Sequence, residues 1–158
     1  DTVNKIGQID SVNIGIFMAR IILLALCLLP IGVLTPILEI GPTHVFNPDW
    51  PGHARVHEVW QLITNALLAA LALWFALSRR DIKTASLLGL LVNSAFLASV
   101  LLAPFYGGTM RHSDGTEIAF GGVNLAVAIM VAATIGLLAI YLDGRMSGER
   151  RSGLDGQA

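Results

Sequence analysis

Three of the four histidines in the chain stand in one segment, residues 44–65, with the sequence HVFNPDWPGHARVHEVWQLITN. Two of them form an H-x-x-x-H pattern. On a helix this spacing places both imidazoles on one face, one turn apart, where they can bind the same metal ion. Zinc or copper suits imidazole-rich ligation, and iron suits it when carboxylates help. A divalent metal centre is therefore one hypothesis, and its expected ligands are His44, Asp49, His53 and His57.

Acid–base catalysis without a metal is a second hypothesis for this segment. A histidine exchanges its proton near neutral pH, and burial moves a carboxyl group toward the same range. The expected acid–base groups are His57, Glu58, His112 and Asp114. Arginine can bind an anionic head or stabilise an oxyanion. The side chains expected to bind a substrate are Arg55, Trp60, Gln61, Asn65 and Arg111. The plainer alternative is that these polar groups meet only water and lipid headgroups at a helix end.

Polar residues recur at every fourth position through this segment: Asp49, His53, His57, Gln61 and Asn65. Each step of four turns the helix by only about 40° beyond a full turn, so the five residues follow one slowly winding face. Lipid penalises exposed amides such as those of Gln61 and Asn65. We therefore expect this face to point into the interior of a helix bundle.

Other cofactor chemistry finds less support. Residues four apart on one helix cannot supply opposite axial ligands to one haem, so haem is not expected; His112 is the only histidine distant enough to be a second ligand. The single cysteine, Cys27, lies in an apolar run and forms no CxxC pattern. Neither GxGxxG nor GxxxxGK[ST], the phosphate-binding patterns, occurs in the chain.

The elements that must position these groups are strongly apolar. The 158 residues are 54% hydrophobic and 13% charged, whereas a soluble domain carries about a quarter charged residues. About 20 apolar residues cross a bilayer, and the expected spans are about 14–40, 52–78, 84–105 and 118–142. The first is too long for a signal-peptide core and has no A-x-A site. We predict an all-α, polytopic four-helix bundle, a single domain over residues 1–158 with a disordered polar tail at about 144–158.

Local signals refine two of these helices. Pro30 and Pro36 lie within the first span and predict a kink or an early unwinding there. Asp49 stands just before Trp50-Pro51 and is expected to cap the second helix, since aspartate is a good N-cap and proline is tolerated in the first turn.

Charge distribution predicts the orientation in the membrane. Four spans place both termini on one side, and eight of the ten Lys and Arg residues fall on that side, with only Arg55 and Arg111 opposite. Cytoplasmic loops are enriched in Lys and Arg, so both termini are expected in the cytoplasm. All four histidines then face the non-cytoplasmic side, in two loops that are neighbours in a four-helix bundle. The expected location is a bacterial inner membrane or an equivalent membrane.

These observations favour an integral-membrane enzyme acting on a lipophilic substrate at a His/carboxylate site on the non-cytoplasmic face, with or without a metal. Two alternatives stay open: a non-catalytic subunit of a larger membrane complex, contacting a partner, lipid or pigment, and a haem- or quinone-binding redox anchor. Expected partners are membrane lipids, a lipophilic small molecule and, for the first alternative, partner subunits. A net charge of −1 gives no sign of nucleic-acid binding. In architecture alone, the layout is similar to that of sterol isomerases of the emopamil-binding type and of glutathione-linked eicosanoid enzymes.

Overall fold

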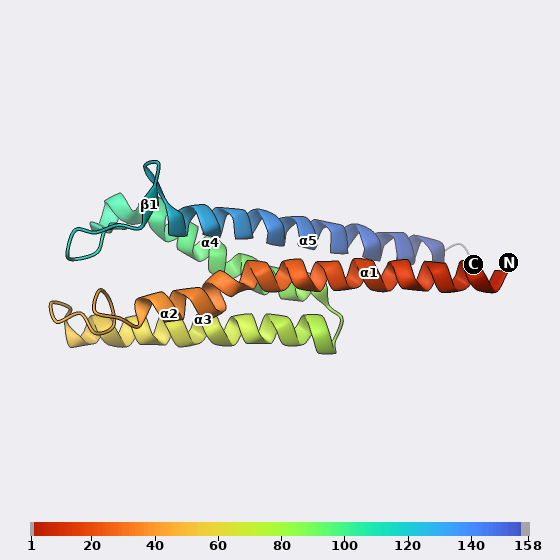
Figure 1. Cartoon of the computed structure of the whole chain (residues 1–158), viewed down its shortest axis with the longest axis horizontal. Coiled ribbons are helices and arrows are strands. Elements are labelled where there is room, and N and C mark those ends of the chain that lie inside the picture. Colours follow the sequence, from red (N-terminus) through yellow and green to blue (C-terminus); the bar gives the residue numbers. More distant parts are fainter. Residues whose placement is uncertain (1, 156–158) are drawn as a thin grey trace.

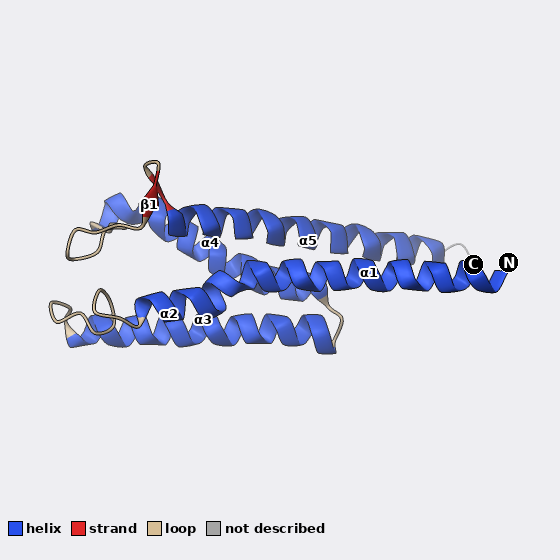
Figure 2. Ribbon diagram, in the orientation of Figure 1, coloured by secondary structure: helices blue, strands red, loops and turns tan. Residues whose placement is uncertain are grey.

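A computed structural model describes the backbone of residues 2–155 and the side chains of residues 14–144. The part of the chain that the structure describes is mostly helical (Figure 2). In order, its elements are α1 (Thr2–Leu29), the π-helical turn η1 (Pro30–Leu34), α2 (Thr35–Glu39), α3 (Gly52–Ser78), α4 (Ile82–Tyr106), β1 (Ala119–Phe120), β2 (Val123–Asn124) and α5 (Leu125–Asp155).

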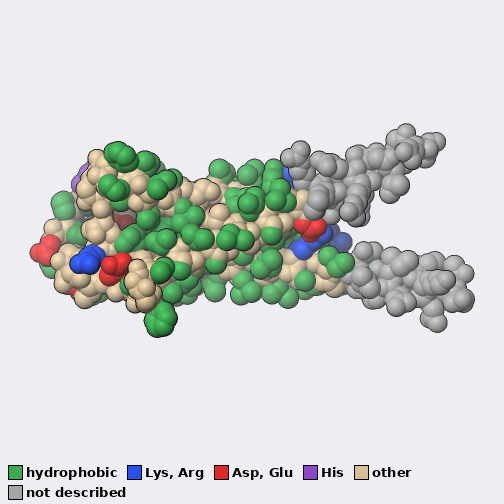
Figure 3. Space-filling model, turned by 90° about the horizontal axis from the view of Figure 1, so that it is seen from above, with side chains coloured by type: hydrophobic (Ala, Val, Ile, Leu, Met, Phe, Trp, Pro, Cys, Tyr) green, Lys and Arg blue, Asp and Glu red, His purple; other side chains and the backbone are tan. Residues whose placement is uncertain are grey.

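Four helical stretches are long and apolar enough to cross a membrane: Ile14–Glu39, Gly52–Ser78, Ile82–Tyr106 and Leu125–Gly144. The all-α, multi-pass membrane fold predicted from the sequence is confirmed. Hydrophobic side chains cover much of the middle of the molecule, as expected of a surface that meets lipid (Figure 3). The side of the membrane that each end faces stays a prediction.

The first span is interrupted where its prolines predict an interruption. Pro30 has no N–H to donate to the carbonyl four residues earlier, and its ring crowds that carbonyl. The chain responds with one wider turn, in which Thr35 N–H donates to Pro30 O instead of to a carbonyl four residues back. The helix changes direction at this turn, so that α2 runs beside the start of α3 (Figure 1).

The fourth helix begins later than expected, at Leu125 rather than near residue 118. Residues 119–124 instead form a two-stranded hairpin, in which Phe120 pairs with Val123 across Gly121-Gly122. Both glycines have positive φ, +59° and +81°, as a two-residue hairpin turn of this kind requires. Asn124 then caps α5, because its Oδ1 accepts a hydrogen bond from Val127 N–H at 3.2 Å.

Small residues let the helices approach closely. The inward face of α3 carries Ala69, Ala72 and Ala76, all buried. A Cβ added to Gly32 in η1 would lie 2.8 Å from the Ala69 Cβ. One added to Gly89 in α4 would lie 2.8 Å from a Leu28 methyl and 2.9 Å from one of Leu137. Close packing of small residues is the usual source of cohesion between helices in a membrane.

The helices place the two connecting loops, 40–51 and 107–118, at one end of the bundle, while α1 begins and α5 finishes at the other (Figure 1). At that second end Arg20 pairs with Asp143, and Arg79 lies over the Trp74 ring. α5 extends to Asp155, and the side chains of residues 145–158 lie outside those that the structure describes. Disorder of the predicted tail therefore stays a prediction.

Candidate functional site

Asn47 joins the two loops at the site end. Its side chain is 1% exposed, and its Nδ2 donates to Thr43 O at 3.1 Å and to Ser113 Oγ at 2.7 Å. Its Oδ1 accepts from Asp49 N–H at 2.9 Å. Because Ser113 belongs to the loop before α5, one buried amide both folds loop 40–51 on itself and holds loop 107–118 against it.

A histidine pair lies beside this junction, one from each loop. The rings of His44 and His112 meet edge to face with centroids 5.1 Å apart, and His44 also meets Trp50 at 5.5 Å. The Nδ1 of His44 lies 2.8 Å from Glu39 Oε2, at the end of α2. When Nδ1 carries the proton it donates to this carboxylate, and Nε2 is left as an acceptor. We call Glu39, His44 and His112 the loop cluster.

Burial, and after it the neighbouring His112, lower the pKa of His44 from its ordinary value of 6.5. A carboxylate at hydrogen-bond distance favours the charged imidazole, but in this loop burial and the second histidine outweigh it. The neutral form of His44 is therefore favoured at neutral pH. Glu39, at the end of α2, is held beside His44 by this contact.

Loop 107–118 is shaped by its own hydrogen bonds. Asp114 Oδ1 accepts from the Thr116 hydroxyl at 2.7 Å and from its N–H at 2.9 Å, and these bonds lower the pKa of the Asp114 carboxyl. The Nδ1 of His112 lies 3.1 Å from the Thr116 Oγ1. Arg111 lies 3.6 Å from Glu117. These bonds order the loop around Asp114, and its expected catalytic role stays a prediction.

The other two histidines form a separate pair on α3. The Nε2 atoms of His53 and His57 are 3.0 Å apart, and the rings are nearly perpendicular with centroids 4.5 Å apart. The shared face that H-x-x-x-H predicts is thus confirmed. The structure divides the four histidines into this pair and the pair in the loop cluster. Trp60 lies one turn further, its ring 6.0 Å from that of His57.

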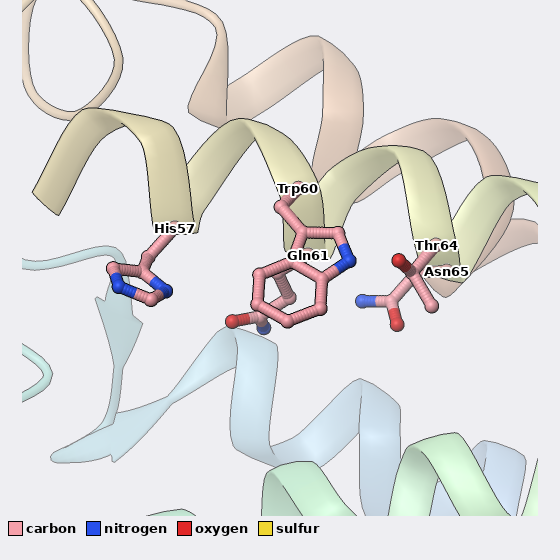
Figure 4. A pocket seen from close by; sticks show the side chains of 5 residues that line it. All are labelled: His57, Trp60, Gln61, Thr64 and Asn65. Atoms are coloured by element: carbon pink, nitrogen blue, oxygen red, sulfur yellow. The ribbon is translucent and has the colours of Figure 1, made fainter. Parts of the chain in front are cut away.

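A pocket of about 330 Å³ opens beside this pair and is lined by five residues of α3: His57, Trp60, Gln61, Thr64 and Asn65 (Figure 4). Their side chains point from α3 toward the ribbons of α4 and α5 (Figure 4). Four of the five are exposed and Asn65 is half-buried. We call this the α3 pocket. It brings together three residues expected to bind a substrate and one expected to be catalytic.

The polar face of α3 was expected to point into the bundle interior. The side chains that line the α3 pocket do point toward α4 and α5 (Figure 4), but they stay largely exposed and are not packed in the core. Asp49, His53, His57 and Gln61 are all exposed, and the interior is filled instead by Leu62 and the alanines beyond it. Alanine admits a closer helix approach than glutamine or histidine, so the small residues take the interior. Asp49 also makes no cap: α3 begins after Pro51 without a side-chain cap, and Asp49 donates its own N–H to Asn47.

The remaining predicted residues lie apart from the α3 pocket. Arg55 donates to the carbonyls of Asn47 and Pro48, at 2.6 and 3.4 Å, and so fastens the loop to α3. Glu58 is not among the residues that line the α3 pocket. Among residues 14–144, no three His, Cys, Asp or Glu side chains lie close enough together to hold a metal ion. The expected ligands His44 and Asp49 thus do not complete a centre with the α3 pair.

Four residues of these sites were not among the predicted ones: Glu39, Asn47, Thr64 and Ser113. Glu39 carried a weak signal, because it is a carboxylate at the end of a span and five residues before a histidine. Thr64 lies next to Asn65 and one turn beyond Trp60, so helical spacing alone places it near them. Asn47 and Ser113 are 66 positions apart, and no local pattern pairs them.

The fold and the two sites define a small polytopic membrane protein with a polar end and an open pocket on α3. Comparison with protein-family models, with curated proteins and with solved structures finds no match to this chain. The function must therefore be argued from the sites themselves.

Proposed function

We propose that this chain is an integral-membrane enzyme that binds a lipophilic substrate in the α3 pocket and exchanges a proton with it through His53 and His57. The observation that carries the proposal is the 3.0 Å contact between the two imidazoles at a pocket on a membrane-spanning helix. The pocket lies on the side of α3 that faces α4 and α5 (Figure 4), and the substrate would enter it through its open side. By the distribution of Lys and Arg, the pocket faces the non-cytoplasmic side.

The imidazole pair is suited to proton transfer. In a hydrogen bond between two Nε2 atoms, one ring donates its Nε2–H and the other accepts with the lone pair of its Nε2. One proton therefore lies between the two Nε2 atoms. When one ring takes up a proton from a substrate, the other can share the positive charge through that bond. General acid–base catalysis of this kind contributes about 10²–10⁴-fold to a rate. Gln61 and Asn65 would orient the polar head of the substrate beside the pair.

A metal-dependent form of the same proposal uses the same pair. His53 and His57 would supply two ligands to a zinc or copper ion, and water or substrate oxygens would complete its coordination. Elemental analysis of protein purified without metal-affinity resin tests this form, because the metal content of His53→Ala/His57→Ala should fall if the pair binds it.

The proposal is tested by deuterium exchange. The purified protein is placed in vesicles of a total membrane lipid extract in D₂O, and the lipids are analysed by mass spectrometry for deuterium on carbon or for a moved double bond. We expect such a product with the unaltered chain and a fall of about 100-fold in His57→Ala. Ser99→Ala is the control, since the Ser99 hydroxyl donates to Phe96 O in its own helix, and it should leave the rate unchanged. An undiminished rate in His57→Ala would remove the pair from catalysis, and no product with the unaltered chain would overturn the enzyme proposal.

A subunit of a larger membrane complex is the second candidate. Gln61 and Thr64 are exposed within a membrane-spanning helix, and a partner helix with polar residues would cover them as well as a substrate would. Cross-linking from a photoreactive residue at position 64 in native membranes distinguishes the two. A single protein partner captured at full occupancy supports the subunit function, and lipid adducts support the enzyme.

A further inference from the structure

The α3 pocket has no charged wall. None of its five lining residues is a lysine, arginine, aspartate or glutamate. Of the nearest charged residues along α3, Arg55 donates to the carbonyls of loop 40–51, and Glu58 does not line the pocket. With the histidine pair neutral, an ionised head would therefore meet no opposite charge among the side chains of the pocket.

The walls nevertheless offer several neutral hydrogen-bonding groups. Gln61 and Asn65 each present a carbonyl oxygen and an NH₂, Thr64 presents a hydroxyl, and Trp60 presents an indole N–H. In the part of the chain that the structure describes, the side chains of Gln61, Thr64 and Asn65 make no hydrogen bond to another residue. A hydroxyl or carbonyl oxygen can pair with each of these groups, and such pairs gain strength where water is scarce.

The size of the α3 pocket limits what it can hold. A volume of about 330 Å³ lies at the lower end of the range for small-molecule sites, about 300–1,000 Å³. It therefore accommodates a head and a short length of chain, while a longer tail must leave through the open side of the pocket. Trp60, whose side chain is 65% exposed, stands where it can pack against that tail.

We propose that the α3 pocket selects an uncharged lipid whose head carries hydroxyl or carbonyl oxygens and whose tail remains in the bilayer. This inference rests on the proposed function and names its substrate class. Two sources share this chemistry, the monoacylglycerols and the quinones with an alkyl or isoprenoid tail. Fatty acids and anionic phospholipids are excluded from the α3 pocket by their charge.

The inference is tested by quenching of Trp60 fluorescence. The variant Trp50→Phe/Trp74→Phe keeps Trp60 as its single tryptophan and is placed in phosphatidylcholine nanodiscs at pH 8. Three probes are titrated separately: a monoacylglycerol with a dibrominated chain, the fatty acid with the same dibrominated chain, and decyl-benzoquinone. Saturable quenching by the monoacylglycerol or by the quinone is expected, and whichever saturates at the lower mole fraction identifies the source. The fatty acid should quench only in linear proportion to its mole fraction, as a bulk lipid does.

Variants of the walls complete the test. Asn65→Leu and Thr64→Val remove hydrogen-bonding groups with little change of shape and should each raise the half-saturating mole fraction about tenfold. Thr134→Val is the matched control, because the Thr134 hydroxyl bonds only its own helix, donating to Met130 O at 2.7 Å. Saturable quenching by the fatty acid at the same mole fraction as the uncharged probes would overturn the proposed class. If deuterium exchange still depended on His57 in that case, the enzyme proposal would stand with a charged substrate. Linear quenching by all three probes would also overturn the proposal that the α3 pocket binds an uncharged lipid.

Discussion

The hydrogen bond between Asn47 and Ser113 should couple the two loops energetically. The Asn47 side chain is 1% exposed and makes three hydrogen bonds, to Thr43 O, Ser113 Oγ and Asp49 N–H. At about 0.5–1.5 kcal/mol for each bond, Asn47→Ala should lower the free energy of unfolding by roughly 2–4 kcal/mol. Ser113→Ala loses one bond and should cost about 1 kcal/mol. Both variants break the same 2.7 Å bond. The double variant should therefore lower the free energy of unfolding by less than the two single variants do when added together.

A double-mutant cycle measures this shortfall. The free energy of unfolding is obtained from the reversible loss of structure with rising SDS in mixed micelles, followed by tryptophan fluorescence. We expect an interaction of about 1 kcal/mol between Asn47→Ala and Ser113→Ala. Ser99→Ala provides the control, since the Ser99 hydroxyl donates to Phe96 O in its own helix at 2.7 Å; paired with Asn47→Ala it should be additive. Additivity within about 0.3 kcal/mol for the loop pair itself would refute the junction between the loops.

Three further predictions concern packing, capping and topology. Gly89→Ala should lower the free energy of unfolding by about 1–3 kcal/mol, because the added Cβ would lie within 3.0 Å of two leucine side chains. Gly15→Ala is the control, since a Cβ there has nothing within 4 Å. Both variants are measured by unfolding in SDS. Asp81 caps α4 by accepting from Thr84 N–H at 2.9 Å, so Asp81→Ala should cost about 1 kcal/mol at pH 7. The Thr84 side-chain and backbone bonds lower the pKa of Asp81 from 3.8; its contribution is therefore full above that value and lost as the pH falls through the lowered pKa, and a gap between parent and variant that stayed constant down to pH 2 would contradict the cap. Phe46 is 65% exposed in loop 40–51, so Phe46→Cys should react with an impermeant thiol reagent added outside intact cells. The native Cys27 is buried and should add little background labelling. Labelling only after permeabilisation would invert the predicted orientation.

Much of the polar end could be predicted from the sequence because its signals are local. The spacing of His53 and His57 predicts a shared helix face, and the imidazoles indeed meet at 3.0 Å. Spacing does not say which face of a helix packs inward. That choice depended on the alanines of α3 and on Gly32, whose close approach to Ala69 left the polar face outside the packed core.

The β-hairpin before α5 was not predicted from the sequence. Gly121-Gly122 between Ala-Phe and Val-Asn is a hairpin signal, but the neighbouring apolar residues also extend the hydropathy of the fourth span. Hydropathy is an average over a window, so it detects that a span exists and places its ends poorly. Dihedral preference at two glycines decided the boundary.

By itself, the sequence determined that this chain forms four membrane-crossing helices, that the first is broken at its prolines, and that histidines gather at one end. Each of these follows from composition, spacing or the covalent structure of proline, all of which act within a few residues. Only the tertiary structure decided that the four histidines form two separate pairs, that Glu39 holds His44, and that Asn47 meets Ser113. Those contacts join residues from different helices and loops, and they depend on how small residues let the helices approach, which no local pattern encodes.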